Sequence, residues 1–353
     1  MAKKVIVGLS GGVDSSVSAH ILKEQGYDVE GVSLMLFDSQ SCRQLDQAPR
    51  CSNESAIAAA KNAEQLGIRH NIVDARELFS EKVIKPFIDA YSRGITPNPC
   101  ILCNRFVKFP SLIEAADRRR FDFIATGHYA RVQSSEPGAC LLKGTDSGKD
   151  QSYVLYALDK DILTRLLLPL GERKKQEVRQ IAYTLDLHAA TQAESQEICF
   201  IEEKNYASFM KGIANSESGP IIDISSGKEI GQHNGIFLFT IGQRKRLPAA
   251  GKPTYVVRID PATNAVYTGS RDKAQMKRFK VKEINWLADP PGAQFKATVK
   301  IRSTMKDEPA NLNILANGIA EVEFCVPQWA PTPGQSAVFY DGDIVLGGGI
   351  ITY

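Results

Sequence analysis

A glycine-rich segment near the N-terminus constrains the fold more than any other part of the sequence. Residues Gly8–Ser16, with the sequence GLSGGVDSS, follow the apolar run Val5–Val7 and precede apolar residues at a spacing typical of one helix face. The segment therefore predicts a strand, a glycine loop and the start of a helix. Glycines let the backbone approach an anion, and a helix N-terminus offers free N–H groups and partial positive charge. We expect a nucleotide phosphate here; the simpler alternative is a glycine turn with a helix cap formed by Asp14 or Ser15.

The loop differs from the two commonest nucleotide-binding fingerprints. It lacks the Gly-Lys-Ser/Thr ending of the Walker loop and the spacing of the dinucleotide fingerprint. The string SGGVDS at 10–15 instead resembles the pyrophosphate loop of N-type ATP pyrophosphatases. The resemblance implies that ATP is cleaved between its α and β phosphates, with Asp14 holding Mg²⁺ near the leaving pyrophosphate. The ATP-binding residues that it implies in this segment are Gly8, Leu9, Ser10, Gly11, Gly12, Val13, Asp14 and Ser15.

The composition is that of an ordinary globular protein with two or three domains. The chain has 353 residues and a net charge of +3, so any nucleic-acid surface must come from local basic clusters. The candidate clusters are 118–120, 173–175, 244–246 and 277–278, each of which alone is more typical of a solvated face. The sequence contains no long apolar run and no signal peptide, so we expect no membrane span and a cytoplasmic location. In that reducing compartment, the seven cysteines favour reactive or metal-bound thiols over structural disulfides.

Strands alternate with helices in the first part of the chain and dominate the rest. The alternation predicts a doubly wound parallel sheet, an α/β fold, in which ligands bind beyond the carboxyl ends of the strands. After about residue 200, glycines, prolines and short β-type runs predict a small β-rich central domain and then a C-terminal β-barrel. The predicted domains are 1–202, 203–275 and 276–353. The strands expected are Val5–Val7, Val29–Leu36, Ile68–Val73, Phe121–Ala125, Pro220–Ile224, Ile236–Thr240, Tyr255–Ile259, Ala265–Thr268, Ala297–Arg302, Ala320–Val326, Ala337–Tyr340 and Ile344–Leu346, the last after a tight turn at Asp341-Gly342.

A second informative segment carries two of the cysteines. In TPNPCILCN at 96–104, two prolines stiffen the approach to a Cys-x-x-Cys pair formed by Cys100 and Cys103. Alone, such a pair is a redox motif, half of a zinc site or half of an iron–sulfur site. No second pair at metal spacing exists, and Cys199, in SQEICFI at 195–201, reads by itself as a small buried residue.

Six ordered motifs together identify a family resemblance. They are SGGVDS at 10–15, TPNPCILCN at 96–104, ATGHYAR at 125–131, KDQSY at 149–153, SQEICFI at 195–201 and TIGQRK at 240–245. With them the chain resembles the tRNA-uridine 2-sulfurtransferases, the MnmA family of tRNA thiolases. The resemblance implies that ATP adenylates the C2 oxygen of the wobble uridine, which sulfur then replaces with release of AMP and pyrophosphate.

The resemblance also implies roles for the thiols. Cys199 would carry a persulfide and Cys103 would free its sulfur, ending in a Cys103–Cys199 disulfide. A free thiol is only a few per cent thiolate at pH 7, so we expect the site to lower the thiol pKa. An alternative remains open, in which Cys100, Cys103 and Cys199 hold a [4Fe–4S] cluster with one open iron, because Cys100 stands where family members can carry Asp.

The remaining implied roles concern the nucleotide, the tRNA and the partners. Leu34 and Gly127 would lie against the nucleotide, and His128 beside the reaction centre. A sulfur-donor protein, such as a cysteine desulfurase or a sulfur relay protein, would supply the sulfur. The implied tRNA contacts are Pro97, Asn98 and Pro99, which would meet the target base, and Lys149, Asp150, Gln151, Arg302, Ser303 and Gln335, which would contact other parts of the tRNA.

Two other classes of protein remain as alternatives to a tRNA thiolase. One is an amidating synthetase with the same glycine loop, and the other is a non-catalytic ATP- and RNA-binding protein with structural zinc.

Overall fold

The computed structural model of the chain divides into two compact units. It describes residues 2–37, 52–135, 138–191, 198–201, 209–210, 217–249 and 251–353. The first unit comprises Met1–Val83, Cys100–Glu202 and Gly342–Val345, and the second comprises Ile84–Pro99, Glu203–Asp341 and Leu346–Tyr353. The expected polar loop at 38–50, with Cys42 and the following Cys51, lies outside the described residues.

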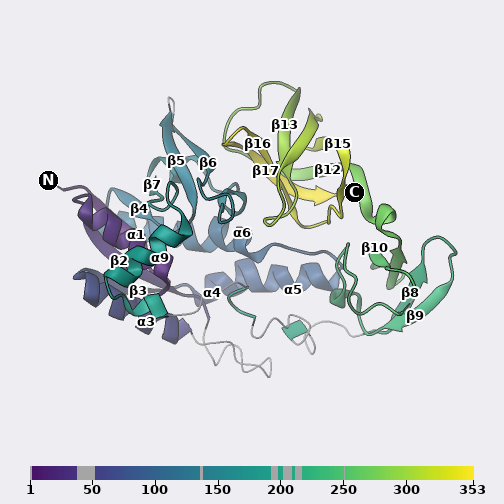
Figure 1. Cartoon of the computed structure of the whole chain (residues 1–353), viewed down its shortest axis with the longest axis horizontal. Coiled ribbons are helices and arrows are strands. Elements are labelled where there is room, and N and C mark those ends of the chain that lie inside the picture. Colours follow the sequence, from purple (N-terminus) through teal and green to yellow (C-terminus); the bar gives the residue numbers. More distant parts are fainter. Residues whose placement is uncertain are drawn as a thin grey trace. The chain divides into compact units, whose positions relative to one another are not determined.

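The first unit contains the predicted doubly wound sheet. Its strand order is β3-β2-β1-β4-β7, and each pair of neighbouring strands is parallel. Figure 1 shows these strands with the helices that cover them. The elements are β1 (Lys4–Gly8), α1 (Val13–Glu24), β2 (Asp28–Met35), α3 (Ser52–Leu66), β3 (Arg69–Asp74), α4 (Arg76–Phe79), α6 (Pro99–Cys103), α7 (Phe109–Arg119), β4 (Phe123–Ala125), β5 (Ala130–Ser135), β6 (Gly138–Lys143), α8 (Lys160–Thr164), β7 (Leu166–Leu167) and α9 (Lys175–Thr184).

Apolar packing on both faces explains why this sheet forms. Val5 and Val7 of β1 belong to one buried cluster with residues of α1, α3 and α9. On α7, Leu112 is fully buried and lies next to Gly8 at the end of β1. Because the central strand is covered on both sides, its sequence is a continuous apolar run and not an alternating one. The expected α/β class is therefore confirmed.

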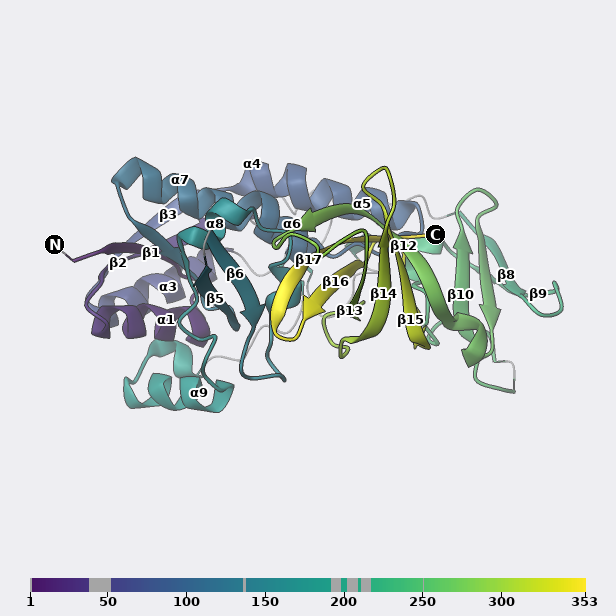
Figure 2. The same cartoon turned by 90° about the horizontal axis from the view of Figure 1, so that it is seen from above.

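The second unit begins with helix α5 and continues with two β structures. A four-stranded sheet of order β10-β11-β8-β9 packs around Ile221, Phe239, Val256 and Val266. The strands β12-β15-β14-β13-β16-β17 then form a sheet that β12–β17 pairing closes into a barrel, coloured green to yellow in Figure 2. The elements are α5 (Lys85–Ser92), β8 (Gly219–Asp223), β9 (Glu229–His233), β10 (Tyr255–Asp260), β11 (Ala265–Gly269), β12 (Gln275–Trp286), β13 (Gln294–Lys300), β14 (Glu308–Ile314), β15 (Ala320–Trp329), β16 (Ser336–Asp341) and β17 (Ile344–Thr352).

The structure corrects one predicted strand and adds several others. Ile236–Thr240 is not a strand, because Ile236–Leu238 forms a 3₁₀ turn after Gly235, whose φ of 121° breaks the extended chain. Short runs of this kind have no periodicity that distinguishes a strand from a buried turn. The hairpin β5–β6 and the strands β9, β12 and β14 were not expected, since polar residues interrupt their apolar pattern. Short helical turns occupy Ser80–Ile84, Asn104–Lys108, Ser152–Val154, His188–Thr191, Ile236–Leu238 and Arg271–Ala274.

Candidate functional site

The glycine loop joins the buried strand β1 to helix α1. Gly12 precedes the helix in an extended conformation, and no side chain caps the N-terminus of α1. The hydroxyl of Ser15 accepts a hydrogen bond from the Ser10 N–H at 3.2 Å and donates one to the Gly12 carbonyl at 3.1 Å. The alternative interpretation, a simple helix cap by Asp14 or Ser15, therefore lacks its capping bond. An uncapped helix start beside a glycine loop fits an anionic phosphate.

Helix α3 fixes the shape of the same loop. Gly11 has a φ of 81°, and a Cβ atom there would lie 2.6 Å from the Ser55 carbonyl oxygen, so only glycine fits. The buried Asn62 donates to the Gly11 carbonyl at 3.0 Å and accepts from the Ala189 N–H at 3.1 Å. Asn62 escaped the sequence interpretation because it lies in an alanine-rich helix with no local signal of a role.

The carboxylate of Asp14 is held by two side chains from distant parts of the sequence. Lys175 donates to both of its oxygens, at 2.7 and 2.8 Å, and the Tyr129 hydroxyl donates to one of them at 2.7 Å. Only 9% of the Lys175 side chain is exposed, against 34% for Asp14. The residue expected to hold Mg²⁺ is thus neutralised by a buried ammonium group. The sequence analysis included Lys175, at the start of α9, only in a basic cluster and Tyr129 only in a motif, and it predicted neither contact with Asp14.

The three expected thiols lie close enough for their charges to interact. Cys100 and Cys103 are on α6, and both raise the pKa of Cys199. Cys103 is buried, and Cys100 and Cys199 are exposed. Although Cys100 and Cys199 keep accessible surface, desolvation by the surrounding protein is the largest cause of the raised pKa of each thiol. The expected lowering of the thiol pKa is therefore wrong, because desolvation, joined at Cys103 and Cys199 by repulsion from neighbouring thiolates, outweighs the nearby positive charge.

That positive charge is Lys108, which sequence interpretation did not single out. It acts against desolvation at all three thiols, and its backbone N–H donates to Cys103. The intervening segment Asn104–Lys108 is a π-helical turn, a feature that often marks functional sites. In it Asn104 is buried and donates to the Val154 carbonyl at 2.9 Å, while its carbonyl oxygen has no partner among the described residues.

His128 follows strand β4 and lies in the same electrostatic environment. Burial first, and then the charge of Lys108, hold the pKa of His128 well below its usual value, so the imidazole is neutral at pH 7. Its Nδ1 atom is 2.8 Å from the hydroxyl of Thr126, and its ring stacks on Phe109 with the centroids 5.8 Å apart. Its neighbour Gly127 packs against the start of α1, where a Cβ atom would lie 2.7 Å from the Asp14 carbonyl carbon. Leu34 is part of β2, paired with Val73.

Several residues expected to contact tRNA make bonds within the protein. Asp150 accepts from the Gly144 and Ser152 N–H groups, and Gln151 accepts from the Tyr129 N–H at 2.9 Å. In the second unit, Arg302 donates to the carbonyls of Ile241 and Ala330 and to the Thr332 hydroxyl. Gln335 donates to the carbonyls of Thr96 and Pro97. Lys149 and Asn98 are half-buried, Pro99 is buried, and Ser303 is exposed. All these residues remain predicted tRNA contacts.

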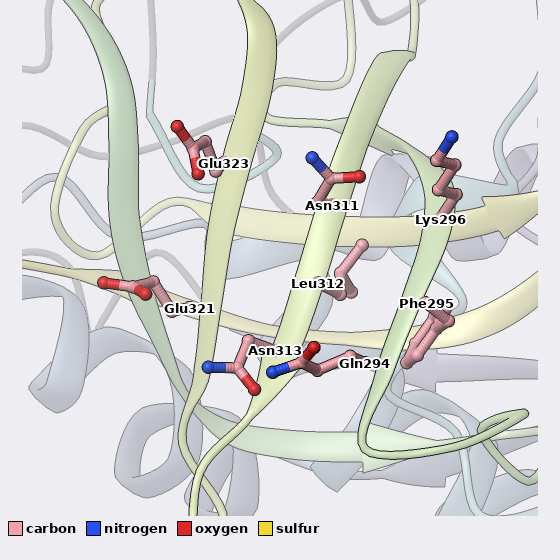
Figure 3. A pocket seen from close by; sticks show the side chains of 8 residues that line it. All are labelled: Gln294, Phe295, Lys296, Asn311, Leu312, Asn313, Glu321 and Glu323. Carbon is pink, nitrogen blue, oxygen red and sulfur yellow. The ribbon is translucent and has the colours of Figure 1, made fainter.

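A polar hollow on the barrel contains none of the predicted residues. It has a volume of about 450 Å³ and is formed on the adjacent strands β13, β14 and β15. Figure 3 shows the side chains that line it. The lining residues are Gln294, Phe295, Lys296, Asn311, Leu312, Asn313, Glu321 and Glu323. We assign it no role.

Two further observations concern metal binding and membrane-spanning helices. Nowhere in the described ranges do three or more His, Cys, Asp or Glu side chains form a group arranged to hold a metal ion. In the same ranges, no helix combines the length and apolarity that crossing a membrane requires.

Comparison with known proteins matches this architecture along the chain. Residues 3–203 match a family described as the tRNA methyl transferase HUP domain, 207–270 its PRC-barrel domain, and 276–351 the aminomethyltransferase beta-barrel domain. Two relatives named tRNA-specific 2-thiouridylase MnmA are similar over 99% of this chain and 98% of their own. They come from Trichormus variabilis, with 43% identity, and Microcystis aeruginosa, with 45%. A solved 4-thiouridine synthetase–RNA complex with bound ATP has a TM-score of 0.40 at 17% identity, over 56% of this chain and 45% of that one.

The fold and the site define a HUP-domain protein with an uncapped glycine loop and a thiol cluster, followed by two β structures. The identity of more than 40% to the two MnmA relatives, over nearly the full length of both chains, identifies one family within this class. The chain belongs to the tRNA-specific 2-thiouridylase (MnmA) family.

Proposed function

We propose that this protein replaces the C2 oxygen of the tRNA wobble uridine with sulfur at the expense of ATP. The observation that carries the proposal is the occurrence, in one unit, of an uncapped glycine loop and three mutually interacting thiols. An amidating synthetase would need the loop but not the thiols. A structural zinc site would need a set of donors that the described residues do not form.

The first step uses the glycine loop. The uridine O2 attacks the α-phosphorus of ATP, an AMP ester forms and pyrophosphate leaves. The N–H groups of α1 and the ammonium of Lys175 suit the charge of the pyrophosphate, and Asp14 is the carboxylate available to Mg²⁺. The neutral imidazole of His128 is available to accept a proton beside the reaction centre.

The second step uses the thiols. The terminal sulfur of a Cys199 persulfide attacks C2 and AMP leaves. The Cys103 thiolate then attacks the Cys199 sulfur, the bond between the two persulfide sulfurs breaks, and its electron pair stays on the sulfur bound to C2. A Cys103–Cys199 disulfide remains, and an external thiol must reduce it before the next turnover. Lys108 stabilises the thiolate forms in this sequence.

The iron–sulfur alternative differs in how the sulfur is delivered. It would place Cys100, Cys103 and Cys199 around a [4Fe–4S] cluster, an arrangement that the described side chains do not adopt here. We therefore derive no step through a cluster. Protein purified without oxygen and assayed for iron and labile sulfide separates the two routes, since iron-free protein with full activity leaves only the persulfide route.

Mass spectrometry of tRNA nucleosides tests the proposed function. tRNA incubated with the protein, ATP and a persulfide donor is expected to contain uridine with sulfur in place of oxygen, and not an added methyl group or nitrogen. Cys199→Ser should abolish 2-thiouridine while pyrophosphate release persists, whereas Asp14→Ala should stop pyrophosphate release. The exposed barrel thiol provides the control Cys325→Ser, which should keep full activity. Normal thiolation by Cys199→Ser would overturn the thiol assignment.

A further inference from the structure

The segment just before the Cys100–Cys103 pair is held by the β part of the chain. Residues Ile84–Pro99 group with the second unit, whereas Cys100 begins a segment of the first unit. The loop Ile95–Pro99 therefore ends where the thiol helix α6 starts, at Pro99. Contacts that restrict this loop therefore also restrict the backbone that leads into the thiol helix.

Thr96 is bonded through its backbone N–H, its backbone carbonyl and its side chain. Its N–H donates to the Pro333 carbonyl at 3.1 Å, and its hydroxyl donates to that of Thr240 at 3.1 Å. Its carbonyl accepts from the Gln335 amide at 3.1 Å, and the same amide nitrogen reaches the Pro97 carbonyl at 3.2 Å. A loop residue with every polar group engaged has little freedom.

Shape complementarity reinforces these bonds at Gly334. This residue has a φ of 89°, and a Cβ atom there would lie 2.3 Å from the Ile95 side chain and 2.9 Å from the Thr96 carbonyl oxygen. Only glycine allows the two backbone segments to approach so closely. The barrel loop is thus shaped to receive the loop at 95–97.

The barrel side of this contact is itself rigidly supported. The Gly334 N–H donates to the Ile351 carbonyl and the Ile351 N–H donates to the Gln335 carbonyl, which ties the loop to β17. Arg302 bonds to the Ala330 carbonyl and the Thr332 hydroxyl, and also to the Ile241 carbonyl next to Thr240. Residues expected to touch tRNA therefore brace the loop that carries Pro97, Asn98 and Pro99.

We propose that Gln335, Gly334 and Thr240 form a clamp that positions the loop Thr96–Pro99 for the thiolation reaction. The inference rests on the proposed function, because it assigns this loop to the target base. Two prolines fix φ on either side of Asn98, so little slack separates the clamped Thr96 from Cys100. Gln335 is on this account a positioning residue, and its amide acts through the loop and not through a bond to RNA.

Paired variants test the clamp against direct tRNA contact. Gln335→Met and Thr240→Val each remove bonds to Thr96 at similar side-chain volume. Each should lower kcat at saturating tRNA on the order of tenfold, with the Kd for tRNA unchanged within about twofold. Because both act on Thr96, the double variant should lose less than the product of the two effects. Gln328→Met is the matched control, since the Gln328 amide donates to the Val326 carbonyl of its own strand.

Hydrogen exchange supplies a readout that is independent of activity. In the absence of tRNA, the amides of residues 94–96 and 98 should exchange faster in Gln335→Met and Thr240→Val than in the wild type and in Gln328→Met. A raised Kd for tRNA with unchanged kcat and unchanged exchange would overturn the clamp and leave direct RNA contact. If the wild type formed no 2-thiouridine, the proposed function would be wrong. The hydrogen-exchange comparison would still show whether these side chains hold the loop in place.

Discussion

The chemistry of single residues here depends on how charge is balanced around the thiols. A persulfide route needs thiolates, yet burial raises the pKa of Cys100, Cys103 and Cys199, and repulsion from neighbouring thiolates adds to the rise at the last two. Within the described part of the chain, Lys108 is the one cation that lowers the pKa at all three thiols, and the same charge disfavours protonated His128. One ammonium group therefore favours the thiolate form of the cysteines and the neutral form of His128 together.

Replacing Lys108 with Met should shift the pH dependence of thiol reactivity. Without the ammonium the thiol pKa rises further, so at a fixed pH the thiolate fraction falls and the rate profile moves to higher pH. We expect iodoacetamide labelling of Cys199, followed by mass spectrometry from pH 7 to 10, to slow about tenfold at neutral pH. Lys61→Met, on the exposed face of α3, should leave the profile unchanged. An unshifted profile for Lys108→Met would contradict the electrostatic role.

Removing Lys175 should weaken both the fold and the first chemical step. Lys175→Met leaves the partly buried Asp14 carboxylate without its ion-pair partner, which we expect to cost about 2 kcal/mol of unfolding free energy. Pyrophosphate release should fall as well, since Asp14 loses its orientation. Urea unfolding measures the first effect, with Arg93→Met as control, because the exposed Arg93–Asp89 pair should contribute under about 1 kcal/mol. Equal stability of the two variants would argue against the role of Lys175.

At the scale of elements, the regular apolar pattern made the parallel sheet and the glycine loop of the first unit predictable. The site residues that were not predicted are in a turn that has no sequence pattern or reach the site only through the tertiary fold. The apolar run of β1 and the glycines after it predict the loop, and strand ends converge at one sheet edge. The π-helical turn Asn104–Lys108 has no sequence signature, so Lys108 was missed. Lys175 and Tyr129 approach Asp14 only through the tertiary fold, across 161 and 115 positions of sequence.

The contact between the end of β4 and the start of α1 can be tested at Gly127. A Cβ atom there would meet two backbone atoms, the Asp14 carbon at 2.7 Å and the Ser15 nitrogen at 2.8 Å, which cannot move independently of α1. Gly127→Ala should therefore destabilise the protein by about 2 kcal/mol and weaken ATP binding. Calorimetry of ATP binding and urea unfolding measure these effects. Gly292→Ala, with its nearest atom at 3.9 Å, should be neutral. Wild-type ATP affinity in Gly127→Ala would show that the helix start tolerates displacement.

At the scale of the whole molecule, a chain of low net charge must attract RNA through exposed cations that form no ion pair within the protein. The net charge of +3 gives little overall attraction. The turn after Thr240 exposes Arg244 and Lys245, with Lys252 nearby, and no ion pair among the described residues involves these three. Gln243 stiffens the turn by donating to the carbonyls of Leu238 and Lys245. By contrast, three other exposed arginines are paired within their own helix or turn: Arg76 with Asp74, Arg93 with Asp89 and Arg118 with Glu114.

The salt dependence of tRNA binding should distinguish these two kinds of cation. Each phosphate contact contributes about 0.7 to 0.9 to the slope of log K against log salt concentration, so replacing Arg244, Lys245 and Lys252 with Gln should reduce the slope by about 2. Replacing Arg76, Arg93 and Arg118 with Gln removes the same charge from paired sites and should change the slope by less than about 0.5. Filter binding between 50 and 300 mM salt measures both. If the slope fell equally in the two triple variants, the turn would not be a phosphate-binding surface, and tRNA affinity would depend on the total charge of the protein alone.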